Sequence, residues 1–209
     1  MFLLFVIVLQ FYTNNETKKD YKEKVTALEQ LEKEQKEQMK TVESLEQQVE
    51  ELTLEFATQQ AGNVAILYKM LQLNVSYDDV KHHFEETDTF VLEFEKMKEK
   101  FGDYATDDAL INLYTRGLMS YDQYAYNTKT NLLLKDITLE LGNVQTDKKM
   151  SFDYYIDIIV DPIDDEPETV SAFGQLVVVN TDTGWKILDD VQKSSELANI
   201  QMERSIFAQ

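Results

Sequence analysis

The chain begins with an apolar run whose first polar residue is Gln10. Residues 2–9 are all apolar, Phe11 and Tyr12 follow, and the first charged residue is Glu16. A membrane-spanning helix needs about 20 apolar residues, so this run is too short to cross a bilayer by itself. It also lacks the basic start and the small-residue cleavage site of a secretory signal peptide.

Three interpretations of this segment fit the sequence. We expect the outer part of a transmembrane helix, which would need about ten more apolar residues, and a basic stretch before them, upstream of Met1. The alternatives are a short membrane-dipping anchor and a hydrophobic element that docks on the folded domain. We therefore predict a membrane segment over residues 1–13. Its membrane residues are Phe2, Leu3, Leu4, Phe5, Val6, Ile7, Val8 and Leu9.

From Tyr21 to Phe56 the apolar residues recur with a heptad period. With Tyr21 at position a, eight of the eleven a and d positions are apolar, and no Gly or Pro interrupts the stretch. A narrow apolar stripe over five heptads is typical of a coiled coil. We predict a coiled-coil stalk over residues 14–62 that forms a homo-oligomer, either a dimer or a trimer; the alternative is a long helix that folds back on its own domain. The predicted seam is Leu28, Leu31, Val42, Leu45, Val49, Leu52 and Phe56.

Beyond a joint predicted at Gly62-Asn63, the apolar stripe becomes wide, which is typical of helices buried in a globular core. Ser, Thr and Asp are preferred helix N-caps, and Gly is common just after a helix end. On these signals we predict a helix over 64–73 and a second helix that is capped by Ser76 or Asp78 and ends at Gly102. A third helix should be capped by Thr106 or Asp107 and end near Gly117. A short turn of helix should follow Ser120.

After Thr130 the apolar period becomes two, which is typical of strands with one buried and one exposed face. In the stretch MSFDYYIDIIVD at 150–161, apolar residues alternate with aspartates. We predict strands at 133–141, 150–161, 170–180 and 185–191, with turns at Gly142-Asn143 and at TDTG. Helices followed by strands indicate an α+β domain, predicted at 63–193, in which helices pack on one face of an antiparallel sheet. Residues 194–209 are a predicted C-terminal tail.

The charge and the cysteine content of the chain exclude some classes of partner and some kinds of site. The chain carries 39 acidic and 20 basic residues, for a formal net charge of −19. Such a surface repels phosphate backbones, so we expect no direct binding of nucleic acid. The absence of cysteine excludes disulfides, a thiol nucleophile and Cys-based zinc sites.

No grouping of residues in the sequence predicts catalysis, a cofactor or a metal, so we expect a protein that is not an enzyme. His82 and His83 are adjacent, and side chains one residue apart on a helix point about 100° apart, so they do not grip one metal jointly. A Tyr/Asp enzyme in the cleft between helices and sheet is an alternative that chance explains equally well, because the chain has 11 tyrosines and many aspartates. Its candidate residues are Tyr114, Tyr121, Tyr124, Tyr126, Asp136 and Asp153.

The loop DPIDDEPE at 161–168 contains five acids and both prolines of the chain. Calcium prefers carboxylate oxygens, but the loop lacks the glycine and the alternating spacing of a calcium loop. We predict a solvated hairpin tip that proline stiffens, and its charge makes it a candidate docking site for a basic partner. Its acids are Asp161, Asp164, Asp165, Glu166 and Glu168.

Residues from about Val64 to Val191 resemble the nuclear transport factor 2-like, cystatin-like superfamily, in which several helices precede a strongly bent antiparallel sheet. The segment Gly184-Trp185-Lys186-Ile187 resembles the final strand of such a domain. The order of apolar segment, helix and domain resembles the bitopic scaffold subunit of type IV secretion and conjugation machines, and the coiled coil and the acidic, cysteine-free composition resemble its Gram-positive versions.

This resemblance implies a membrane-anchored structural scaffold of a secretion or conjugative DNA-transfer channel. Such a scaffold acts through self-association and contacts with other membrane secretion or transfer proteins, and it has no catalytic residues. The resemblance also implies a single-pass protein of the cell membrane, with the bulk of the chain on the extracytoplasmic side.

Three other functions fit the same pattern. One is an extracytoplasmic module that binds a small molecule or peptide in the cone of the sheet, with Phe152, Tyr154, Phe173 and Trp185 lining the pocket. The second is an envelope division or sporulation factor, which also combines a short anchor with a coiled coil. The third is an enzyme in the style of ketosteroid isomerase.

Overall fold

The computed structural model describes residues 2–87, 94–115, 121–146 and 148–195. It divides into two compact units, Met1–Thr53 and Leu54–Gln209. Helix α1 (Phe2–Leu73) supplies the described part of the first unit and enters the second. The remaining elements all belong to the second unit, which confirms the predicted α+β class with an antiparallel sheet.

Helix α1 does not stop at Gly62-Asn63, where the sequence predicted a joint. A glycine inside a helix costs only about 1 kcal/mol relative to alanine. The packing around it outweighs that cost, because Ala61 and Ala65 are 0 % exposed in the core of the second unit. The helix therefore continues to Leu73, which is buried as well.

Two short helices begin at the predicted capping residues. The Ser76 hydroxyl accepts a hydrogen bond from the Asp79 amide at 3.4 Å, and the Thr106 hydroxyl accepts one from the Ala109 amide at 3.2 Å. The single helix predicted to close at Gly102 is described as two helices, and residues 88–93 between them lie outside the described part, as do Gly117 and Ser120. The short helices are α2 (Tyr77–Thr87), α3 (Phe94–Phe101), α4 (Asp107–Thr115) and α5 (Tyr121–Thr128).

The sheet is a meander in which each strand pairs antiparallel with the next, in the order β1-β2-β3-β4. Gly184, at the predicted TDTG turn, has a φ of 111°, a conformation that glycine adopts without strain. The strands are β1 (Thr130–Thr146), β2 (Lys149–Pro162), β3 (Glu168–Thr181) and β4 (Gly184–Ser195).

The turn predicted at Gly142-Asn143 is wrong, because β1 runs through both residues to Thr146. The register between β1 and β2 shifts there, as in a β-bulge. The Ser151 hydroxyl donates to the Asn143 carbonyl oxygen at 3.2 Å and accepts from the Asn143 amide at 3.0 Å. This side chain satisfies the backbone groups that the bulge removes from the ladder, so the strand continues where the sequence suggested a stop.

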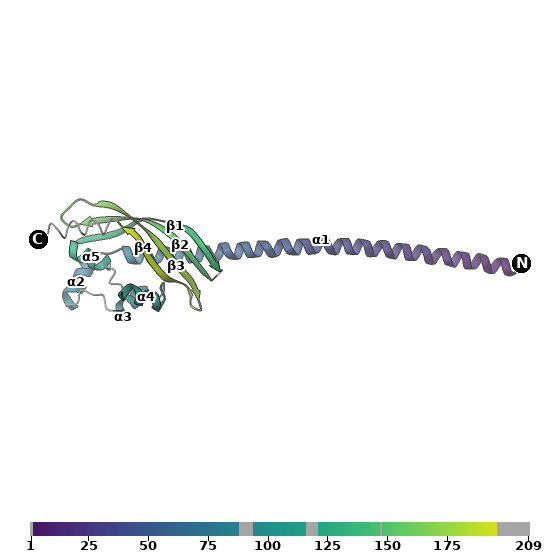
Figure 1. Ribbon diagram of the computed structural model, residues 1–209, viewed down its shortest axis with the longest axis horizontal. Helices are drawn as coiled ribbons and strands as arrows, with labels where there is room; N and C mark the ends of the chain where they lie inside the picture. Colours follow the sequence, from purple (N-terminus) through teal and green to yellow (C-terminus); the bar gives the residue numbers. More distant parts are fainter. Residues whose placement is uncertain (1, 88–93, 116–120, 147, 196–209) are drawn as a thin grey trace. The chain divides into compact units, whose positions relative to one another are not determined.

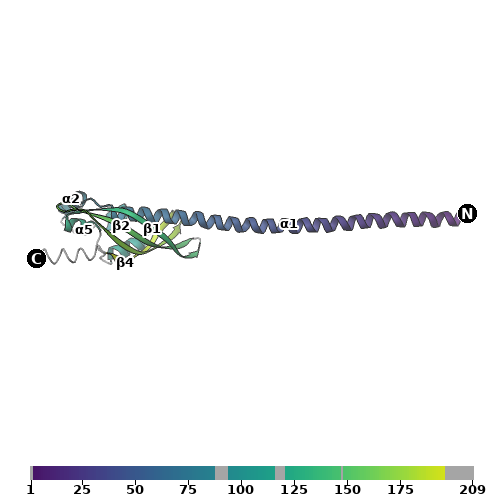
Figure 2. The same cartoon turned by 90° about the horizontal axis from the view of Figure 1, so that it is seen from above.

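The two faces of the sheet have different environments. On β2, alternate side chains such as Phe152, Tyr154 and Ile156 are buried, as the period of two predicts. The last turns of α1 run along the sheet (Figure 1 and Figure 2), and α2, α3 and α4 lie below it in the view of Figure 1. The opposite face, which we call the outer face, carries the exposed rings of Tyr155 and Phe173.

Two isolated backbone bridges protect the edge strands of this sheet. Val75 pairs with Leu132 on β1, with amide-to-carbonyl distances of 2.9 and 2.8 Å. Ala105 pairs with Ile187 on β4, where the Ile187 amide also donates to the Tyr104 carbonyl at 2.7 Å. The connections that follow α1 and α3 therefore satisfy backbone groups that an open edge would leave exposed.

The prediction of a single-pass membrane anchor is contradicted. Across the described residues, no helix combines the length and the apolar character that a bilayer crossing requires. The apolar run at 2–9 gives way to Gln10, Asn14, Asn15 and the charged residues from Glu16 on, so the average over a span-length window is too polar. Residues 2–9 are the beginning of α1, and their side chains lie outside the described part.

A buried ion pair fixes α1 to the last strand. The Lys69 ammonium donates to both carboxylate oxygens of Asp190 on β4, at 3.1 and 2.8 Å, and to the Gln72 amide oxygen at 2.9 Å. The two charged side chains are 1 % and 9 % exposed. Removing one partner of such a pair leaves a buried charge without compensation, whereas removing both does not.

We predict that Lys69→Met or Asp190→Leu alone lowers the free energy of unfolding by about 3–5 kcal/mol. The double variant should lose clearly less than the sum of the two, because it leaves no unpaired charge in the core. Urea unfolding of all four proteins at one protein concentration measures this cycle. Additive losses would show that the two side chains contribute independently.

Candidate interaction surfaces

The predicted heptad seam is exposed along its whole length. The side chains from Thr17 to Phe56 are all exposed in the described part of α1. The seven seam residues are 51–64 % exposed. Self-association through them stays a prediction, and their exposure gives the apolar surface that it would bury.

Local interactions along α1 contribute little to its stability. The Lys24 ammonium and the Asp20 carboxylate are 2.9 Å apart, and Gln47 donates to Glu51 at 2.9 Å, both at a spacing of four residues. Each exposed pair of this kind contributes only about 0.2–0.5 kcal/mol. Most of the stability of a long helix comes from packing an apolar face against a partner.

The acidic loop forms the tip of the β2–β3 hairpin, as predicted. The Ile163 amide donates to the Lys129 carbonyl at 3.0 Å, which holds the tip against the start of β1. Asp164, Asp165 and Glu166 are exposed at the tip itself. Two of the five predicted acids lie within strands instead, Asp161 at the end of β2 and Glu168 at the start of β3. A role of this tip in docking a basic partner remains a prediction.

The four aromatic residues considered from the sequence for an apolar ligand pocket do not share one face of the sheet. Phe152, Tyr154 and Trp185 are 0–7 % exposed and belong to the hydrophobic core, together with residues of α1 and of the short helices. Phe173 has the opposite parity on its strand and points to the outer face, so the four aromatic residues do not line one site.

The Tyr and Asp residues considered for a cleft enzyme are not brought together. Tyr124 is buried in the core, whereas Asp136 and Asp153 lie on the outer face of the sheet. Asp153 forms an ion pair with Lys193 at 3.2 Å on that face. The side chain of Tyr114 lies outside the described part.

The ionisable cluster that does form is centred on Lys69, a residue that the sequence analysis did not single out. Its ammonium lies 4.0 Å from the ring centroid of Tyr154 and 5.9 Å from that of Tyr68. The sequence feature that could have identified Lys69 is its place as a single lysine on an otherwise uncharged helix face. The other residues of that face are Ala61, Ala65, Tyr68 and Leu73. Because this ammonium is buried and its hydrogen bonds are made within the protein, we interpret the cluster as structural.

Burial is the largest cause of the shifted pKa values in this cluster. It lowers the pKa of Lys69, against the opposing effect of Asp190. Burial raises the pKa of Tyr68, Tyr121 and Tyr154, and the negative charge of Asp190 raises all three further. The Tyr121 hydroxyl donates to the Gln192 side chain at 2.8 Å.

The two adjacent histidines of α2 have different environments. His82 is exposed, whereas His83 is half-buried, with its ring 5.6 Å from that of Phe84 and its Nδ1 3.1 Å from the Lys96 ammonium. His83 borders a groove of about 450 Å³ between α2, α3 and α5, which Lys100 and Asp122 also line. Among the residues that the structure describes, no cluster of three or more His, Asp or Glu side chains has the arrangement of a metal site.

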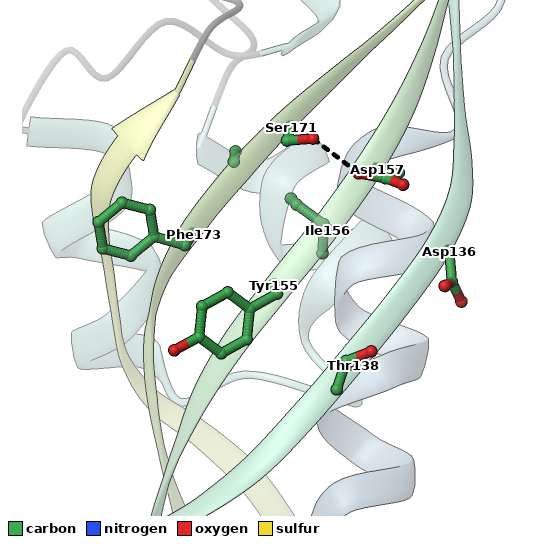
Figure 3. A pocket seen from close by; sticks show the side chains of 8 residues that line it. Asp136, Thr138, Tyr155, Ile156, Asp157, Ser171 and Phe173 are labelled. Atoms are coloured by element: carbon green, nitrogen blue, oxygen red, sulfur yellow. Dashed lines mark hydrogen bonds between the residues drawn. The ribbon is translucent and has the colours of Figure 1, made fainter.

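A second hollow, of about 360 Å³, lies on the outer face of the sheet over β1, β2 and β3. Figure 3 shows Tyr155 and Phe173 side by side on neighbouring strands, with Asp136 and Asp157 at the other side of the hollow. The two rings are stacked, with centroids 6.3 Å apart and planes inclined by 22°. The Ser171 hydroxyl donates to Asp157 Oδ1 at 2.7 Å.

We predict that the stability of the protein passes through an alkaline maximum. The lowered pKa of Lys69 makes the unfolded chain bind more protons between that lowered value and pH 10.5, so stability rises with pH across that interval. Unfolded tyrosines ionise near pH 10, whereas the folded cluster keeps its phenol protons, so stability falls above that pH. Tyr154→Phe should reduce this loss by about 1.4 kcal/mol per pH unit.

Urea unfolding between pH 9 and pH 12 measures these slopes. Tyr155→Phe, the exposed neighbour on the same strand, is the matched control. Equal effects of the two substitutions would contradict burial as the cause.

No protein-family model matches the chain, and no curated protein matches it. Among solved structures, a periplasmic fragment of TraM is similar with a TM-score of 0.44 and 12 % identity, over 65 % of this chain and 96 % of that one. An IcmL-like type IV secretion system protein from Legionella pneumophila is similar with a TM-score of 0.45 and 10 % identity, over 63 % of this chain and 88 % of that one. The intermembrane space region of the chloroplast protein ARC6 is similar with a TM-score of 0.32 and 11 % identity, over 48 % and 77 %. At these TM-scores and identities, the similarities establish neither the fold family nor the function of this chain. The resemblances to the nuclear transport factor 2-like superfamily and to Gram-positive scaffold subunits therefore stay predictions.

Proposed function

We propose that this chain is a non-catalytic structural subunit that self-associates through the heptad seam of α1 and presents its α+β domain to other proteins of an assembly. The exposed seam carries the proposal. Its seven apolar side chains are 51–64 % exposed in the single chain, at the spacing that suits a second helix.

The physical reason is the cost of leaving this surface in water. Complete burial of a Leu, Val or Phe side chain contributes about 1.5–3 kcal/mol. An isolated helix gains none of this, and its polar pairs contribute a few tenths of a kcal/mol each. A second or third copy of the same helix offers the matching stripe, because residues at a and d of one chain pack between those of the next.

The assembly class that we propose is a type IV secretion or conjugative transfer machine. The support is the order of elements, a long heptad helix followed by short helices and a four-stranded antiparallel meander, which resembles the scaffold subunits of those machines. The hairpin tip with Asp164, Asp165 and Glu166 supplies a compact acidic surface for contacts with other subunits.

We expect Leu45→Asp to weaken self-association at least about tenfold, because a carboxylate at a d position would be buried against its copy in the partner helix. Sedimentation equilibrium measures the mass relative to the chain mass of 24.4 kDa. Ser44→Asp is the matched control, since it introduces the same acid at the adjacent exposed position outside the seam. A wild-type protein that stays monomeric, or equal effects of both substitutions, would contradict the proposal.

The assembly class is tested by crosslinking in cells. A photoreactive residue in place of Asp165 at the hairpin tip should capture channel subunits or ATPases of a transfer machine. The same residue in place of Asp182, which is exposed on the β3–β4 turn, is the control for position. Capture of division proteins instead would support the rival class of envelope factor.

A further inference from the structure

The outer-face hollow is lined by aromatic rings and carboxylates, two kinds of group that attract a cation. Tyr155 and Phe173 are direct partners across β2 and β3, and they remain 49 % and 42 % exposed. Aromatic side chains of this size usually bury most of their surface in a core or an interface. The stacked pair therefore leaves ring surface open to a partner at one side of the hollow (Figure 3).

The other side of the hollow contains an unfavourable charge arrangement. Asp136 and Asp157 are register partners on β1 and β2, and like charges directly opposite each other destabilise a sheet. Within the described part of the chain, neither carboxylate forms an ion pair. Lys135, the nearest lysine in sequence, extends instead to the Thr169 hydroxyl at 3.4 Å. The serine that bonds Asp157 is neutral, and the described residues that line the hollow include no lysine or arginine to compensate the two carboxylates.

A positively charged side chain relieves this repulsion and has aromatic surface to lie against. Arginine suits both features, because its planar guanidinium stacks on aromatic rings and donates two parallel hydrogen bonds to a carboxylate. Lysine supplies a point charge and lacks the planar fork. We propose that this hollow binds an arginine side chain presented by a partner protein.

Charge complementarity favours a different protein over a second copy of this chain. The chain carries a net charge of −19, so two outer faces brought together would oppose carboxylates to carboxylates. A basic partner would be attracted by the same field. This proposal uses the sheet domain and does not depend on self-association through α1.

The test uses the full chain and a short fluorescent peptide in which arginine alternates with serine. Fluorescence anisotropy gives its affinity for the wild type and for the double variant Asp136→Asn/Asp157→Asn. We expect binding at least about tenfold weaker in the variant, because both carboxylates that face the guanidinium are lost. Thermal unfolding should show this variant to be folded, since the substitution removes a like-charge pair.

The matched control is Asp164→Asn/Asp165→Asn at the hairpin tip, which removes the same charge from another exposed site. It should change the affinity less than about twofold. An equal loss in both double variants would overturn the proposal, since long-range attraction alone would then account for binding.

A second variant tests the aromatic pair. Phe173→Leu keeps an apolar side chain but removes one of the two rings, so it should reduce the preference for the arginine peptide over a lysine peptide of the same length, while the carboxylates stay in place. No preference in the wild type would overturn the proposal. A change in oligomer mass in Asp136→Asn/Asp157→Asn, with the peptide affinity unchanged, would also overturn it and assign the hollow to a second copy.

Discussion

The packing of the last turns of α1 against the inner face of the sheet is the constraint on which the rest of this structure depends. Ala61 and Ala65 allow a close approach, and the Lys69–Asp190 pair fixes the helix to β4. Residues of the short helices, such as Phe101 and Leu110, share the core with α1, and the inner-face aromatic residues Phe152, Tyr154 and Trp185 are buried in it. Among the described residues of the second unit, the candidate binding surfaces include the outer face, the hairpin tip and the groove beside His83.

We expect the buried ion pair to add specificity to the contact between α1 and the sheet. A lysine in a core requires its carboxylate partner at one position, so a register in which α1 is shifted along the sheet would leave an unpaired charge. Tyr68 and Tyr154 lie beside the ammonium and complete its surroundings. This cluster therefore resembles a catalytic site in its shifted pKa values but is closed to a substrate, which explains why perturbed protonation alone does not identify an enzyme.

The seam and the outer-face hollow suggest a division of tasks between the two units. The heptad stretch has the repetitive apolar pattern that suits identical partners. The hollow combines exposed rings with uncompensated carboxylates, which suits a different and basic partner. The proposed structural subunit would use both kinds of contact, one to set its own copy number and one to recognise another protein.

Periodicity in the sequence by itself determined the long helix, the four strands, the buried face of β2 and the caps at Ser76 and Thr106, because these features depend on local spacing and local hydrogen bonds. Only the tertiary structure decided where a helix or strand continues past residues that locally favour a turn. Packing of Ala61 and Ala65 carries α1 past Gly62-Asn63, and the Ser151 hydroxyl carries β1 past Gly142-Asn143. Strand register likewise brings Asp136 opposite Asp157, and α1 brings Lys69 to Asp190. These pairs are distant in sequence, so no local pattern specifies them.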